Sequence, residues 1–99
     1  MIKHVVTFKF KPFLNDEKKT KKEQEIKVAL LALKEKIEVL RSIEVGININ
    51  PNEEFNLVLT TSFDKFEDIE AYAKHPAHLE VVELIKPVKA GRACVDYEE

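Results

Sequence analysis

Residues 2–10 read IKHVVTFKF, and this stretch alternates between two kinds of side chain. The even positions are mostly apolar: Ile2, His4, Val6, Phe8 and Phe10. The odd positions hold lysine, valine and threonine. Period-two alternation is typical of a β-strand with one buried face. We therefore predict a strand over Ile2–Phe10 whose even side chains face the core.

A helix is predicted next, over about Asp16–Val39, after Pro12 and Asn15 interrupt the strand pattern. Its apolar stripe recurs every three or four positions: Ile26, Leu30, Leu33, Ile37 and Leu40. This spacing places the stripe on one helix face, which we expect to pack on the sheet. Lysines and glutamates alternate over residues 17–25, Glu23 included, so we interpret the start of the helix as solvated rather than as a nucleic-acid or lipid patch.

Two further strands are predicted to form a hairpin. Ser42–Asn50 has apolar residues at its odd positions, and the same pattern resumes at Phe55 and continues to Phe63. Asn50-Pro51-Asn52 lies between them and is typical of a turn.

The last third of the chain predicts a broken helix and a final strand. Asp64 and Glu67 have the spacing of a capping box, which would open a short helix that carries Tyr72 on its inner side. Pro76 suits the first position of a new helix, which ends before Pro87. Arg92–Tyr97 then reads as a strand. We expect its apolar residues to share one side: Ala93, Val95 and Tyr97.

The resulting order, βαββαβ, predicts an α+β fold in a single domain spanning residues 1–99. It suits a ferredoxin-like sandwich, in which a four-stranded antiparallel sheet carries its helices on one face. No repeat or low-complexity segment indicates a linker between domains.

The second face of the predicted sheet has an uncharged centre of small side chains: Val5, Thr7, Gly46, Val58, Thr60, Ser62 and Cys94. Charged residues surround it: Lys3, Lys9, Glu44, Arg92 and Asp96. In a chain with 34% charged residues, a solvated sheet centre would ordinarily carry lysine and glutamate. We therefore predict a homodimer in which two copies pack sheet against sheet. The alternative is a solvated face that is rich in threonine by chance.

Composition narrows the function classes. The net charge is -2, from 16 basic and 18 acidic residues, which does not favour nucleic-acid binding. Apolar runs are short, so no membrane span or secretory signal is predicted. The single cysteine, Cys94, suits a reducing compartment, and we expect a cytoplasmic protein. The only glycines are Gly46 and Gly91, so no phosphate-binding loop is present and no cofactor is predicted.

Five segments together resemble a known family: Met1–Val6, Phe8–Lys11, Phe63–Tyr72, His75–His78 and Val95–Tyr97. The most specific is His75-Pro76-Ala77-His78 with Tyr72 three residues before it. The chain resembles the stress-responsive alpha/beta barrel proteins, or Dabb domain, over nearly its whole length. The resemblance implies a dimeric alpha/beta barrel. Functions in the family vary, and plant members include stress-induced proteins that form larger oligomers and a cyclase that closes a polyketide ring.

The three histidines have different sequence contexts. His4 lies on the helix-facing side of the first strand, where a core histidine bonded to a backbone carbonyl is the simplest interpretation. His75 precedes Pro76 and is expected at a helix N-terminus. His78 lies in the first turn of the new helix, where the dipole disfavours an imidazolium, and the intervening turn could bring Tyr72 close to it.

The resemblance gives these residues roles. In the cyclase members, the residues matching Tyr72 and His78 activate the substrate, and the residue matching His4 lies near the same pocket. Those members also carry aromatic residues on the first helix, and Asn15–Leu40 has none here, so the substrate class does not transfer.

Three interpretations follow. The first is a pocket lined by His4, Tyr72 and His78 that binds an unidentified small molecule. The second is a cofactor-free cyclase or isomerase with His78 as base and Tyr72 as hydrogen-bond donor. The third is a stress-related assembly protein in which Tyr72 and His78 only hold the helix break together.

Two other chemistries are not favoured. A metal site would need His75 and His78, with Pro76 between them, together with His4 or a distant carboxylate, and no Cys or Glu completes a tetrahedral set, so none is predicted. Cys94 has no adjacent base in the sequence, and we interpret it as a small interface residue rather than a nucleophile.

Overall fold

The computed structural model describes all of residues 1–99 and confirms the ferredoxin-like fold. In chain order the elements are β1 (Ile2–Phe10), α1 (Asp16–Leu31), a 3-10 turn η1 (Ala32–Glu35), β2 (Ser42–Ile47), β3 (Leu57–Phe63), α2 (Glu67–Lys74), α3 (Pro76–Ile85) and β4 (Lys89–Glu98). No helix is long and apolar enough to cross a lipid bilayer.

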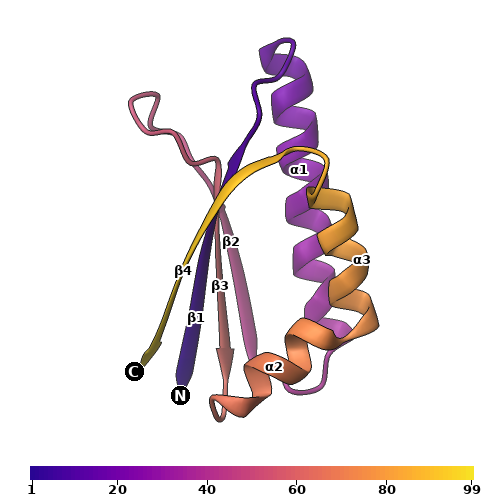
Figure 1. The fold of residues 1–99 in the computed structure, drawn as a ribbon, viewed down its shortest axis with the longest axis vertical. Helices are drawn as coiled ribbons and strands as arrows, with labels where there is room; N and C mark the ends of the chain where they lie inside the picture. Colours follow the sequence, from indigo (N-terminus) through magenta and orange to yellow (C-terminus); the bar gives the residue numbers. More distant parts are fainter.

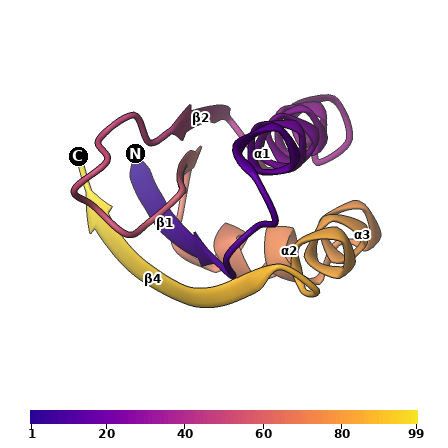
Figure 2. The same cartoon turned by 90° about the horizontal axis from the view of Figure 1, so that it is seen from above.

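The strands form one antiparallel sheet in the order β2-β3-β1-β4. All helices lie on one face of it, with α1 and α3 side by side and α2 across the end where the N-terminus lies (Figures 1 and 2). β1 and β4 are neighbours, which brings the two chain ends together. The core between sheet and helices includes the predicted even residues of β1 from Val6 onward and the whole predicted stripe from Ile26 to Leu40.

The first helix is shorter than predicted. It ends at Leu31, and the chain tightens into η1 before it enters β2 at Ser42. Leu33 and Ile37 are nevertheless 1% and 2% exposed. The apolar stripe was therefore predicted correctly, but Leu33 is buried from the 3-10 turn, and Ile37 and Leu40 are buried from the irregular segment after it rather than from a continued α-helix.

The β2–β3 hairpin is also shorter than predicted, because a side chain organises its loop. β2 ends at Ile47, and Asn48 then accepts a hydrogen bond from the Asn50 backbone N–H at 2.8 Å. Its side-chain amide donates to the Phe55 carbonyl at 2.9 Å. Asparagine competes in this way with ladder hydrogen bonds, so the strands separate where sequence alternation alone would continue them.

The predicted capping box at Asp64 is wrong. α2 begins at Glu67 with Phe66 as its cap, and no side chain bonds this helix end. Asp64 instead accepts two hydrogen bonds from Arg41, from Nη2 at 2.7 Å and from Nε at 3.0 Å. The hydrogen bonds from Arg41 lower the pKa of the Asp64 carboxyl. Asp64 therefore forms an ion pair with the residue that precedes β2 and does not cap α2.

The last strand was predicted with its two faces exchanged: its even residues, not its odd ones, face the helices. β4 pairs with β1 so that His4 lies opposite Asp96, Val6 opposite Cys94 and Phe8 opposite Arg92. Paired residues share a face, so the even residues of β4 face the helices. The apolar odd residues, Ala93, Val95 and Tyr97, join the outer face instead, and Cys94 is not an outer-face residue.

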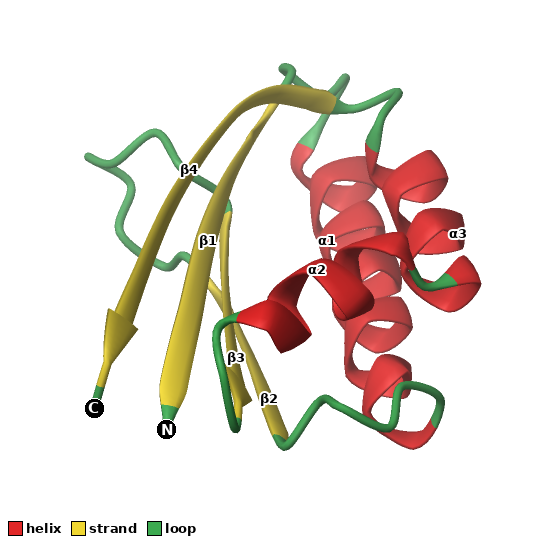
Figure 3. Ribbon diagram, turned by 60° about the horizontal axis from the view of Figure 1, so that its bottom comes forward, coloured by secondary structure: helices red, strands yellow, loops and turns green.

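The outer face is therefore more apolar than predicted. No helix covers it (Figure 3). Its large apolar side chains are exposed in the single chain: Val58 at 37%, Val95 at 63% and Tyr97 at 46%. Threonine and glycine lie between them, and Ser42 and Ser62 bond each other beside them. An exposed apolar sheet centre of this kind is typical of an interaction surface.

Glu23 was predicted to be solvated, but its side chain is buried, with 5% of the residue exposed. The side chain of Asn56 provides its hydrogen-bond partner. The Asn56 side-chain amide donates to the Glu23 carboxylate at 3.0 Å, and its oxygen accepts from the Phe10 backbone N–H at 2.8 Å. One side chain thus joins the end of β1 to α1.

Replacing Asn56 by alanine is expected to lower the free energy of unfolding by about 2 kcal/mol, since a buried carboxylate and a strand N–H both lose their partner. Asn52→Ala is the matched control, because the Asn52 side chain lies exposed in the same loop. Urea denaturation of the two variants checks this; equal stability would show that Asn56 has no such role.

Candidate functional site

The break between α2 and α3 places the two predicted site residues. His75 ends α2 and caps α3 with extended backbone, at φ -63° and ψ 136°, as expected before a proline. Its Nδ1 accepts a hydrogen bond from the Ala77 backbone N–H at 3.0 Å. Pro76 occupies the first turn, where its missing N–H is not needed. The predicted structural role of His75 at a helix N-terminus is confirmed.

Tyr72, from α2, is buried at 1% exposure beneath the sheet. Its ring packs edge-on against Phe63, with centroids 5.3 Å apart, and against His4 at 6.4 Å. Its hydroxyl is buried and has no hydrogen-bond partner in the protein. Burial raises the pKa of Tyr72 to about 12, a shift that the Arg92 charge opposes. The hydroxyl is therefore a protonated, unused donor.

His78, from the first turn of α3, lies against Tyr72 with ring centroids 4.5 Å apart. Its Nδ1 is 3.0 Å from the Ala73 carbonyl oxygen. A carbonyl only accepts, so Nδ1 carries the proton and Nε2 keeps a free lone pair. Burial lowers the pKa of His78; the hydrogen bond to the Ala73 carbonyl opposes this shift, and the electrostatic influence of the surrounding side chains, Arg92 among them, adds to it. Burial, the largest of these influences, therefore favours the neutral imidazole.

His4 is 8% exposed and faces the helices as predicted, but a carboxylate rather than a carbonyl satisfies it. Its Nδ1 lies 2.5 Å from the Asp96 carboxylate on β4. The neighbouring Cys94 Sγ lies 3.5 Å from the same nitrogen. The His4 nitrogen, the Cys94 sulfur and the Asp96 carboxylate oxygen lie within 4.8 Å of one another. This cluster was not predicted from the sequence, because Cys94 and Asp96 were placed on the outer face of the sheet. Burial and the Asp96 charge raise the pKa of the Cys94 thiol, which makes it a poor nucleophile.

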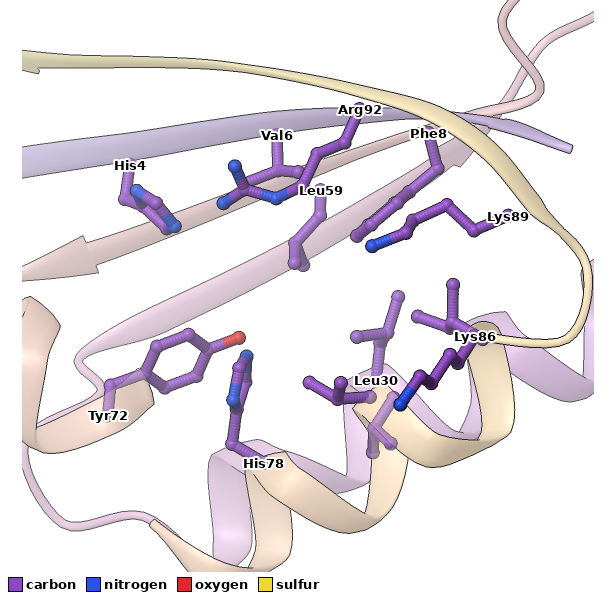
Figure 4. Close-up of a pocket in the computed structure, with 13 residues that line it drawn as sticks. His4, Val6, Phe8, Leu30, Leu59, Tyr72, His78, Lys86, Lys89 and Arg92 are labelled. Atoms are coloured by element: carbon purple, nitrogen blue, oxygen red, sulfur yellow. The ribbon is translucent and has the colours of Figure 1, made fainter. Parts of the chain in front are cut away.

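His4, Tyr72 and His78 line one cavity of about 200 Å³ between the sheet and α3 (Figure 4). Its walls are mostly hydrocarbon, from β1, β3, α1 and α3: Val6, Phe8, Leu30, Leu59, Val81, Val82 and Ile85. Lys86, Lys89 and Arg92 complete the lining. The volume lies below the range of about 300–1,000 Å³ that is usual for small-molecule sites, so a compact apolar molecule fits it best.

The arrangement combines a hydrogen-bond donor and a free base at one end of an apolar cavity. A carbonyl oxygen could accept from Tyr72 while Nε2 of His78 meets a neighbouring C–H group. The sequence predicted these two residues and His4 at one place. It missed the three cations, because Arg92 was assigned to the wrong face of β4 and because single exposed lysines carry no sequence signal.

The chain matches the family model described as the Stress responsive A/B Barrel Domain, or Dabb, over residues 2–99. No curated protein in the comparison gives a significant match.

Several solved structures share the fold. A dimeric protein of unknown function from Bacteroides fragilis is 42% identical, with a TM-score of 0.92 over 99% of this chain and 95% of that chain. A dimeric ferredoxin-like protein of unknown function from Thermobifida fusca is 20% identical, with a TM-score of 0.82 over 99% and 90%. Hydroxynitrile lyase from Passiflora edulis is 17% identical, with a TM-score of 0.78 over 97% and 90%. At such identities the last two show a common fold alone.

Proposed function

The chain belongs to the stress-responsive A/B barrel domain family, and on that premise we propose that it binds a small, mostly apolar carbonyl compound in the cavity under the sheet. The Tyr72 hydroxyl donates to the carbonyl oxygen. His78 and His4 border the same end of the ligand, and the apolar walls surround its hydrocarbon part (Figure 4).

The observation that carries this proposal is the buried Tyr72 hydroxyl without a partner. Leaving a buried donor unsatisfied costs about 1–3 kcal/mol, so such groups in native proteins need an explanation. A purely structural Tyr72–His78 pair would use the hydroxyl to hold the helix break. Here His75 and the bond between His78 Nδ1 and the Ala73 carbonyl hold the break, and the Tyr72 hydroxyl takes no part in it, which leaves this hydroxyl for a ligand.

Tyr72→Phe tests the proposal. We expect the free energy of unfolding to stay level or rise by about 1 kcal/mol, because the variant removes an unsatisfied donor. Affinity for 2-nonanone should fall about tenfold through loss of one hydrogen bond. Thermal unfolding and calorimetric titration measure the two effects.

Tyr97→Phe is the matched control, since Tyr97 lies on the outer face. A variant of Tyr72 that loses stability and leaves ketone binding unchanged would support the structural interpretation and refute the binding proposal.

A second candidate function, proton transfer, is favoured by the state of His78. With Nδ1 bonded to Ala73, Nε2 is the free base of a neutral imidazole. It would take a proton from the carbon beside the ligand carbonyl, and the C–H electron pair would form an enolate whose oxygen accepts from Tyr72. Return of the proton to carbon or oxygen completes an isomerisation or prepares a ring closure, without a cofactor.

The protein is proposed to act as a homodimer, forming the α/β barrel through its outer sheet face. Two structures with this fold, from Bacteroides fragilis and Thermobifida fusca, are described as dimeric. In this chain the exposed Val58, Val95 and Tyr97 supply the apolar surface that such packing needs. A second copy would bury these side chains and leave the cavity on the opposite face of each sheet.

A further inference from the structure

The cavity lining is charged in one sign only. Three cations border it, Lys86, Lys89 and Arg92, and no Asp or Glu does. None of the three forms an ion pair in the structure, although six pairs form among other residues, one of them between His4, which lines the cavity, and Asp96. A mostly apolar pocket bordered by three exposed cations without carboxylate partners has an electrostatic preference for an anion.

The two arginines of the chain differ in whether they have a carboxylate partner. Arg41 is half exposed, binds Asp64 side-on and so serves the fold. Arg92 has no carboxylate partner and extends from β4 on the helix-facing side, opposite Phe8. Figure 4 shows its guanidinium over the cavity, with Lys89 reaching in from the same strand. Its charge acts on both Tyr72 and His78, so it belongs electrostatically to the same cavity.

A guanidinium presents parallel N–H groups that match a carboxylate, and a lysine ammonium adds a flexible point charge. Tyr72 and His78, which supply a neutral donor and a neutral base, line the same cavity as these cations, and most of the remaining lining is apolar. Building on the function proposed above, we infer that the ligand is an amphipathic oxo acid. Its carboxylate binds Arg92 and Lys89, and its carbonyl lies at Tyr72.

The test compares two probes of one shape, octanoate and octanamide, by calorimetric titration at low salt. We expect octanoate to bind at least about tenfold more tightly, and added salt to weaken only octanoate. Arg92→Met and Lys89→Met should each weaken octanoate about fivefold or more and leave octanamide unchanged. Lys34→Met is the control, an exposed lysine of η1 away from the cavity.

Equal affinity for the acid and the amide overturns the inference, as does loss of octanoate binding in Lys34→Met alone or binding of neither probe. The two variants act independently, so one that fails to fold leaves the other as the test. The Tyr72→Phe experiment uses a neutral ketone, which separates the proposals. Ketone binding with no preference for the acid refutes only the anion site, whereas an acid preference together with 2-nonanone binding that Tyr72→Phe leaves unchanged refutes only the carbonyl site.

Discussion

His78→Gln is expected to slow hydrogen–deuterium exchange at the α-carbons of 2-nonanone by roughly 10²–10⁴-fold relative to the unmodified protein, the contribution of a positioned general base. Glutamine preserves much of the size and polarity of histidine, but it cannot take up a proton. Proton NMR in D2O follows the loss of the two α-proton signals directly.

The pH dependence of this exchange follows from the pKa directions at the site. The base is the neutral form of His78, and its pKa lies below the ordinary 6.5, chiefly through burial. Activity should therefore persist as pH falls through 6.5 and decline only at more acid pH. On the alkaline side Tyr72 stays protonated up to a pKa of about 12, so no second limb is expected near neutrality.

His75→Gln is the matched control, because the His75 ring bonds the Ala77 N–H and does not line the cavity. It should lower stability through the lost cap and retain exchange activity. If His78→Gln exchanges as fast as the unmodified protein, or if the acid limb lies at the ordinary histidine pKa, His78 is not the base and the pocket is a binding site only.

How far the fold could be predicted depended on burial. β1 lies between two strands and has helices on one face, so its alternation was unambiguous. β4 is an edge strand whose residues are nearly all exposed in the single chain. Its apolar residues, such as Val95, were predicted to face the helices, but they lie on the outer face of the sheet. Pairing register, which sequence alternation does not encode, decides this orientation: Asp96 lies opposite His4.

The site was predicted unevenly for the same physical reason. Tyr72 and His78 are placed by local chain geometry, since a proline after His75 must end one helix and begin another. Asp96 and Arg92 reach the site across the sheet, from residues about ninety positions away in the chain from His4. The capping-box prediction was wrong for a related reason: Asp64 binds Arg41, which is distant in the sequence, and does not cap the helix that follows it.

The corrected β4 orientation strengthens the proposal of a homodimer. Val95 lies opposite Val5 on the outer face, and the flanking residues of both strands on that face are threonine, alanine, lysine and tyrosine. The charged Arg92 and Asp96, predicted to surround this face, lie on the other side of the sheet. If the outer face were solvated instead of covered by a second copy, a larger apolar area would be exposed to water than the sequence analysis indicated.

Val95→Lys is expected to weaken dimerisation at least about 100-fold, or about 2.7 kcal/mol, because two-fold symmetry buries an unpaired ammonium twice at one interface. Val28→Lys is the matched control: Val28 is 65% exposed on α1, against 63% for Val95, so both changes add the same charge at similar exposure. Sedimentation equilibrium at micromolar concentration should find Val28→Lys at twice 11.4 kDa and Val95→Lys at the monomer mass. If the unmodified protein is monomeric, or if both variants stay dimeric, the two sheets do not pack through this face, and the apolar centre formed by Val58, Val95 and Tyr97 must have another cover.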